Sequence, residues 1–558
     1  MHISCNSRAL PFWSAVRSTL ALALLANISG LPVSAQAQDT PGQDTAKESE
    51  VQELRAVIKD LQKRLSALEK EKNDPNAGAS SDQSQNAKMA LVGAGTNTAA
   101  PLSASPATSP NVEAGSMLAM NEQPKVIEPA KSEPFAFADF TWLNGNARTK
   151  EAAFDSKFFT PEIRADVSYI ADFNRPADDT IGGSTEAFRA NEIQLTQLGV
   201  GGDFHYDNVR ARLMTQFGMY STTTPRNDAS PARGQWDLSN AYRYLSEAYG
   251  GYHFNSLHGV NLDAGIFMSY IGLFSYYNFD NWAYQPSYVS SNTPWFFNGL
   301  RAQVFVTDKL KIEPWFINGW QSYGKFNAKP GLGGQILWRP TGWLSLVSNN
   351  YGLGTDTLGN QNRTRFHTDN SIQVKYYDRP SEILDKMAFS LTGDAGCESG
   401  GGVSCRGNSV RIVNGQRIVS PKQSFLGFMA YNRFWFDKDR YGITLGGGKM
   451  NNPGRYLTLL PPINGATAFS ATPYFTENPG DPFKAWDASA TFDYMPSQYI
   501  TFRWEYDYRA ASVPYFTGKG GITPPGGNTG PLGSLVPGWS PDLRQDESRL
   551  NLAIMVKF

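Results

Sequence analysis

The last ten residues of the chain alternate strictly between apolar and polar positions. Successive side chains of an extended strand point to opposite faces, so this period of two separates an apolar face from a polar one. Roughly ten such residues suffice for a tilted strand to cross a bilayer while its polar face meets water. The pattern predicts a membrane-spanning strand, with a strand of a soluble sandwich as the alternative for this segment alone. The apolar positions are Leu550, Leu552, Ile554, Val556 and Phe558, and the polar ones are Arg549, Asn551 and Lys557.

The same alternation recurs upstream, most clearly between residues 487 and 509. A charged side chain that faces lipid costs roughly 2 to 4 kcal/mol at the membrane midplane, so the polar face of each strand should point into a barrel. The predicted lipid-facing residues of two neighbouring strands are Ile500, Phe502, Trp504, Tyr506 and Tyr508, and Ala488, Ala490, Phe492 and Tyr494.

Short turns between alternating segments allow the strands to be counted. In bacterial barrels the periplasmic turns are short and the external loops are long. Seven short turns join eight hairpins, which predicts an all-β fold: a closed antiparallel transmembrane β-barrel of about 16 strands over residues 134–558. The turns are His205 to Asn208, Asn255 to Gly259, Thr307 to Lys309, Arg339 to Gly342, Asp378 to Lys386, Asp437 to Arg440, and Met495 to Gln498.

Composition agrees with this fold. Charged residues make up only 18% of the chain and aromatic residues 13%, with 52 Gly and 34 Pro, which favours strands and turns over helices. The formal net charge is -1, and Lys and Arg are scattered rather than gathered in blocks. We therefore expect no nucleic-acid partner.

The amino-terminal region predicts export. Residues 1–37 have the pattern of a secretory signal peptide, with early charges at Arg8 and Arg17, an apolar core over residues 19–28, and a small-x-small cleavage site at residues 35–37. We expect the mature chain to be placed in the outer membrane with its amino-terminal segment in the periplasm.

A short coiled coil is predicted over residues 46–72, where apolar residues recur at spacings of three and four. Val and Ile at a positions with Leu at d favour a dimer, whereas residues 64–69 resemble a trimer-specifying pattern, and we favour the trimer. A lone amphipathic helix is the alternative. Residues 73–132 are rich in Ala, Ser, Asn, Gly and Pro and predict a disordered periplasmic tether. The seam residues are Val51, Leu54, Ile58, Leu61, Leu65 and Leu68.

A barrel of about 16 strands is wide enough to hold an aqueous channel, and the alternation assigns charged residues to its wall. Positive and negative candidates are equal in number, which predicts neither strong anion nor strong cation selectivity, although a ring of charge at one constriction would outweigh the sum. The positive candidates are Arg164, Arg210, Arg212, Arg243, Arg301, Lys311, Lys375, Arg503 and Arg509. The negative candidates are Asp166, Glu247, Asp263, Glu313, Asp394, Asp487, Asp493, Glu505 and Asp507.

Residues 272–297 form the candidate constriction loop, because their many aromatic side chains are too apolar for a solvated external loop. We expect the loop to pack inside the barrel, where Asp280 would face lumenal arginines such as Arg212 or Arg503. The alternative is that the aromatic cluster caps the mouth or packs at a subunit interface.

Catalysis is the competing class of function, and the sequence gives it little support. His205, His253 and His258 lie at or beside inferred turns, which leaves His367 near an external end as an ordinary polar rim residue. The histidines are isolated, so we expect no catalytic site, no metal site and no cofactor. Two cysteines of the mature chain, Cys397 and Cys405, lie in a Gly-rich external loop and predict a loop-closing disulfide.

Several long stretches resemble the OmpL-like β-barrel porin-2 family of bacterial outer-membrane proteins. They are FAFADFTWLNGNART from Phe135, FGMYSTTTPRNDASPARGQW from Phe217, NNPGRYLTLLPPINGA from Asn451 and MPSQYITFRWEY from Met495. The resemblance implies outer-membrane location and passive transport but identifies no solute. The terminal Phe558 also resembles the carboxy-terminal insertion signal of such barrels.

Together these features predict an outer-membrane porin, a homotrimer that contacts membrane lipid and passes small hydrophilic solutes. The coiled coil is a candidate contact with peptidoglycan or another periplasmic partner. The alternative is a plugged barrel with a structural, adhesive or envelope-tethering role.

Overall fold

A computed structural model describes residues 133–558 except 182–186, 229, 231–233, 235, 326–327, 355–361, 408, 414, 454–481, 532–533 and 535. The predicted signal peptide, coiled coil and tether lie outside the described residues, as does most of the stretch from Asn451 that carries part of the family resemblance.

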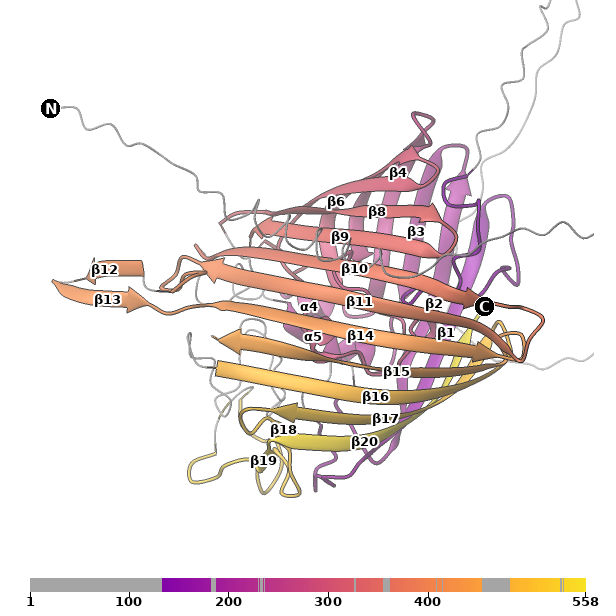
Figure 1. Cartoon of the computed structure of the whole chain (residues 1–558). Helices are drawn as coiled ribbons and strands as arrows, with labels where there is room; N and C mark the ends of the chain where they lie inside the picture. Colours follow the sequence, from indigo (N-terminus) through magenta and orange to yellow (C-terminus); the bar gives the residue numbers. More distant parts are fainter. Residues whose placement is uncertain are drawn as a thin grey trace, which may run out of the picture. The chain divides into compact units, whose positions relative to one another are not determined.

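Sixteen strands form one closed antiparallel barrel, in which each strand pairs with its neighbours in chain order (Figure 1). The predicted all-β barrel and its strand number are confirmed. The wall strands are β1 Phe159–Asp172, β2 Ile193–Tyr206, β3 Val209–Thr215, β4 Leu245–Phe254, β5 Val260–Met268, β6 Phe296–Thr307, β7 Leu310–Ile317, β8 Gly331–Thr341, β9 Leu344–Leu353, β10 Thr364–Asp378, β11 Leu384–Ser399, β14 Ser424–Phe436, β15 Tyr441–Pro453, β16 Pro482–Ser497, β17 Ile500–Ala511 and β20 Asp546–Lys557.

All seven predicted turns join consecutive wall strands, and they lie together at one end of the barrel, the turn end. The carboxyl terminus lies at the same end, where β20 closes the ring against β1. The opposite end, the loop end, carries the long connections. Two of these contain small hairpins outside the wall, β12 Ser409–Val413 with β13 Gln416–Ser420, and β18 Phe516–Thr517 with β19 Leu543–Arg544. The β12–β13 hairpin projects beyond the barrel (Figure 1).

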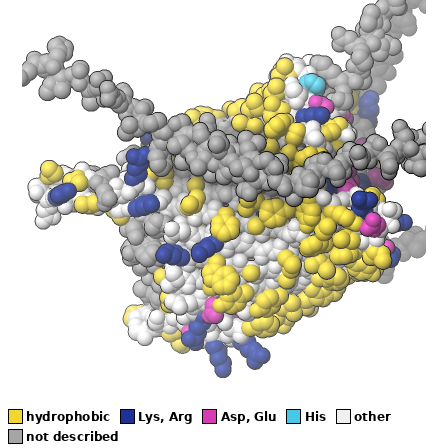
Figure 2. Space-filling view, in the orientation of Figure 1, with side chains coloured by type: hydrophobic (Ala, Val, Ile, Leu, Met, Phe, Trp, Pro, Cys, Tyr) yellow, Lys and Arg dark blue, Asp and Glu magenta, His cyan; other side chains and the backbone are white. Residues whose placement is uncertain are grey.

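The outer face of the wall is apolar, as the alternation predicts. In β17 the outward Trp504 and Tyr506 are more than 40% exposed, whereas Arg503, Glu505 and Asp507 between and beside them are buried inside. Hydrophobic side chains gather over the visible outer wall, and charged ones lie beyond them toward the ends (Figure 2). Exposed aromatic residues occur near both ends of the wall, where membrane interfaces favour amphipathic rings. Those near the turn end include Phe204, Tyr206, Tyr252, Phe254, Trp338, Trp343 and Tyr376.

The helices in the described part of the chain are all short. No helix among the described residues is long and apolar enough to span a membrane. They are α3 Tyr220–Thr223, η1 Pro225–Asn227, α4 Leu238–Ala241, η3 Asn278–Asp280 and α5 Tyr288–Ser291.

The amino-terminal part of the predicted barrel domain is not a wall strand. The first wall strand begins at Phe159, and residues 134–151 instead form an irregular segment, the strap, which lies at the turn end. Residues 134–137 already form a turn, and Gly145 further along has a φ of +81°, in the left-handed region that favours glycine, so the strap does not extend as a strand.

Candidate functional site: the barrel lumen

The connection between β5 and β6, residues 269–295, folds into the barrel and is called the inner loop. Its aromatic side chains are buried, including Phe274, Trp282 and Tyr288, which belong to a cluster with Tyr431 and Trp435 on the inward face of β14. The expected inward packing of residues 272–297 is therefore what the structure shows, and apolar contacts rather than water surround this part of the loop.

Two wall carboxylates bind backbone amides of the inner loop. Glu505 accepts hydrogen bonds from the amides of Tyr284 and Gln285, at 2.5 and 2.7 Å. Asp487 accepts from the amide of Tyr288 at 2.9 Å and from the hydroxyl of Ser287 at 2.8 Å. Because charge-assisted hydrogen bonds are stronger than neutral ones, these carboxylates anchor the loop to β16 and β17.

Asp280, the last residue of η3, pairs with Arg164 of β1, which is one of the predicted lumenal arginines, rather than with Arg212 or Arg503, the two named as examples. Its carboxylate lies 3.0 Å from the guanidinium of Arg164 on β1, and both side chains are about 7% exposed. The expected partner Arg503 instead donates to the carbonyl of Asn281 at 2.6 Å and pairs with Asp493 at 2.7 Å. Asp280 is therefore neutralised by a direct ion pair, and it cannot act as a free negative charge opposite the arginines.

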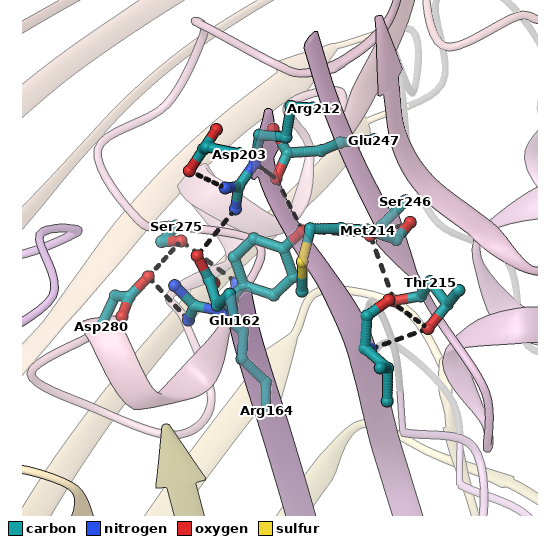
Figure 3. A network of polar contacts seen from close by, with 12 residues as sticks. Glu162, Arg164, Asp203, Arg212, Met214, Thr215, Ser246, Glu247, Ser275 and Asp280 are labelled. Carbon is teal, nitrogen blue, oxygen red and sulfur yellow. Dashed lines mark hydrogen bonds and ion pairs between the residues drawn. The ribbon is translucent and has the colours of Figure 1, made fainter. Parts of the chain in front are cut away.

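Arg212 on β3 is the centre of a second ionic cluster. Its guanidinium contacts Asp203 at 2.8 Å, Glu247 at 3.0 Å and Glu162 at 3.1 Å, while Glu162 also pairs with Arg164 (Figure 3). The hydroxyl of Tyr277 in the inner loop donates to Glu247 at 2.8 Å. The loop is thus held at β1 to β4 as well as at β16 and β17.

The wall from β3 to β7 carries paired charges with more access to solvent. Asp263 accepts from Arg301 at 3.0 Å and lies 3.3 Å from Arg210, whose side chain is 28% exposed. Lys311 pairs with Glu313, which also accepts from Gln303. Positive and negative side chains are paired in both of these clusters, so neither cluster presents charge of one sign alone.

The predicted pore-lining residues fall into two groups, one with partly exposed side chains and one with buried side chains. Arg210, Arg212, Arg301, Lys311 and Lys375 keep side-chain exposures between 11% and 28%. Asp487 is half-buried, and the buried ones are Arg164, Asp166, Glu247, Asp263, Glu313, Asp394, Asp493, Arg503, Glu505, Asp507 and Arg509.

Arg243 does not belong to the barrel wall, so its prediction as a pore-lining residue is wrong. It precedes β4 in the long connection from β3, where its guanidinium lies 5.3 Å from the ring of Tyr244.

The strap closes part of the turn end from inside. Its Trp142 donates from Nε1 to the carbonyl of Gly342 at 3.0 Å, and its Asn144 amide donates to Gln373 on β10 at 2.9 Å. Arg148 donates to the carbonyls of Ser497, at 2.7 Å, and Ile500, and burial lowers the pKa of Arg148 to about 10. At neutral pH Arg148 therefore stays charged and bound to the β16–β17 turn.

His367 is not a rim residue, contrary to the sequence interpretation. Its side chain is fully buried, with Nε2 2.8 Å from Asp394, and its ring lies between those of Trp320 and Phe425. The described part of the chain contains no group of three or more His, Cys, Asp or Glu residues that could hold a metal. Cys397 and Cys405 form a disulfide with a Cα–Cα distance of 5.0 Å at the base of the β12–β13 connection.

Several lumenal residues were not among the sequence candidates. Glu162, Asp203 and Arg433 are wall residues that the alternation could have indicated, since each occupies an inward position. Trp142 and Asn144 carry no such signal, because they lie in an irregular segment whose path depends on the whole barrel.

Comparison with known protein families identifies the family of this chain. A family model described as beta-barrel porin-2, OmpL-like, matches residues 164–536. The chain belongs to this OmpL-like porin family. The predicted family is confirmed, and this porin is an outer-membrane channel by family and fold. No curated protein matches the chain.

Three of the solved structures similar to this porin share between 10% and 13% identity with it and have TM-scores of 0.40. The outer membrane channel DcaP of Acinetobacter baumannii is 13% identical over 73% of this chain and 100% of its own. OmpT of Vibrio cholerae, in its trimer form, is 10% identical over 72% and 100%. The anion-selective porin from Comamonas acidovorans is 11% identical over 72% and 99%.

Proposed function

We propose that this porin allows small hydrophilic solutes to diffuse passively across the outer membrane. The observation that carries the proposal is the closed 16-stranded wall, which is apolar outside and ionic inside, with a connecting loop folded into its lumen. Barrels of this size are wide enough for a water-filled channel, and the inner loop narrows it.

Weak ion selectivity is part of the proposal. Arg212, Asp263 and Glu313 each contact at least one side chain of opposite charge, so the wall presents balanced pairs rather than a ring of one sign. A reversal potential close to zero across a salt gradient would support this, and a large potential of either sign would contradict it.

Swelling of proteoliposomes in neutral sugars of graded size tests the solute class. We expect fast swelling with the smallest sugars and a decline as size increases, because the inner loop limits the aperture. Swelling no faster than that of protein-free liposomes, with correctly folded protein present, would contradict passive diffusion.

The second candidate is a plugged barrel with a structural, adhesive or tethering role. It is favoured by the buried aromatic cluster that the inner loop forms with the strap and with the inward face of β14. Homotrimer assembly, the periplasmic position of the amino-terminal segment and a contact with peptidoglycan remain proposals from the predicted coiled coil.

A further inference from the structure

The strap crosses the whole turn end of the barrel. At its start the amide of Phe135 donates to the carbonyl of Asp308 at 2.7 Å, in the β6–β7 turn. At its end the amide of Lys150 donates to the side chain of Gln498 at 2.7 Å, in the β16–β17 turn. Eight of the 16 strands lie between these turns, β7 to β11 and β14 to β16, so the two turns are on opposite sides of the ring.

The middle of the strap meets the inner loop inside the barrel. The amide of Trp282 donates to the side-chain oxygen of Asn144 at 2.7 Å, and the indole of Trp282 donates to the carbonyl of Trp142 at 3.1 Å. The amide of Gly145 donates to the carbonyl of Asp280 at 3.1 Å. Asn144 and Trp142 are each about 2% exposed, so water does not compete for these bonds.

Gly145 shows how close this contact is. A Cβ at this position would lie 2.3 Å from the carbonyl oxygen of Leu273 in the inner loop, and the positive φ of Gly145 further disfavours any other residue. The strap backbone is thus packed directly on the loop backbone.

The strap also connects the inner loop to two sides of the wall. Asp280 accepts from Gly145 through its carbonyl and from Arg164 of β1 through its carboxylate. Asn144, which accepts from Trp282, donates its own amide to Gln373 of β10. Strap, inner loop and wall therefore form one hydrogen-bonded unit, in which the loop position depends on Asn144 and Gly145.

We propose that the strap is a second constriction element of the channel, which sets the aperture both by crossing the turn end and by fixing the inner loop through Asn144. This inference rests on the proposed passive diffusion, and it adds residues 134–151 to the parts that determine solute size. The expected consequence is that a barrel without the strap admits larger solutes.

Single-channel conductance of the full chain and three variants tests the proposal. The variants are deletion of residues 134–151, Asn144→Ala, and the control Phe137→Ala. Phe137 belongs to the strap, but its ring is 40% exposed, lies beside Lys309 and Phe140, and is not a member of the buried cluster that holds the inner loop. We expect the deletion to raise conductance about twofold or more, since more of the lumen of a 16-stranded barrel becomes open to water. Asn144→Ala should raise the conductance less, and Phe137→Ala should leave the conductance unchanged.

A deletion variant with the wild-type conductance and solute cut-off would overturn the proposal.

Hydrogen exchange of the Trp282 amide provides a second measurement that does not depend on conduction. We expect about tenfold faster exchange in Asn144→Ala than in the wild type or Phe137→Ala, because the amide loses its buried acceptor. Unchanged exchange would overturn the role of Asn144. If exchange accelerates as expected while all variants, the deletion included, stay silent in bilayers, the result counts against passive diffusion and not against the strap–loop contact.

Discussion

Glu505 illustrates how single residues of the wall position the inner loop. Its carboxylate accepts from two consecutive loop amides, and also from Thr491 at 2.7 Å and Asn551 at 3.2 Å. All of these partners are neutral donors, so the negative charge strengthens every bond. The residue is fully buried, and together with Arg503, which donates to the carbonyl of Asn281, it attaches the loop to β17.

Replacing Glu505 by Gln keeps the shape of the side chain but removes its charge. Charge-assisted bonds contribute about 1.5 to 3 kcal/mol each and neutral ones about 1, so we expect the amides of Tyr284 and Gln285 to exchange about tenfold faster or more. Hydrogen exchange read by mass spectrometry measures this. Asp546→Asn is the control, because Asp546 is exposed on β20 away from the loop. Equal protection in Glu505→Gln and wild type would refute the anchoring role.

The charged wall positions could be predicted from the sequence, but their partners could not. Alternation places Arg164, Arg212 and Arg503 on the inward face because a local period of two is enough to assign the face of a strand. The contact between Asp280 and Arg164 depends on where the inner loop crosses the lumen. No local pattern encodes that path, so the sequence indicates a lumenal arginine as the partner of Asp280 but does not single out Arg164.

At the scale of elements, the strands and turns followed from the sequence and the strap did not. Phe135 and Phe137 are two residues apart, as on one face of a strand, but residues 134–137 form a turn and Gly145 turns the chain again. The inward face of β14 is also unusual, since Tyr431 and Trp435 are apolar where water was expected. The inner loop covers that face, and only the folded barrel reveals this.

The disulfide between Cys397 and Cys405 should order the connection that carries the β12–β13 hairpin. Closing a loop of this length contributes about 2 to 3 kcal/mol in the chain-entropy view. We expect a Cys397→Ser and Cys405→Ser double variant to be cleaved faster by protease in residues 406–422, with the heat stability of the barrel unchanged. Loss of barrel stability would show that the bond supports the wall instead.

Phe558 should affect closure of the barrel as well as recognition. Its amide donates to the carbonyl of Ile163 at 2.9 Å, its carbonyl accepts from the amide of Ile163 at 3.3 Å, and its ring lies 5.7 Å from that of Tyr499. Deleting Phe558 removes these contacts between the last strand and β1. We expect a lower yield of inserted protein in outer-membrane fractions, and a wild-type yield would argue against the predicted signal.

At the scale of the whole molecule, the predicted coiled coil should influence assembly and leave the barrel intact. The described barrel closes on its own, with β20 paired to β1. Deleting residues 46–72 should therefore reduce subunit association on native gels without preventing insertion. An unchanged oligomer would remove the coiled coil from the account of assembly.

The central claim is that the barrel encloses a water-filled path despite the inner loop and the strap. Purified full-length protein reconstituted in a planar bilayer tests it most directly. The account predicts stepwise current increases that are ohmic with voltage, each from one inserted channel or assembly. Repeated insertion of folded protein without any current would contradict it and favour the plugged barrel.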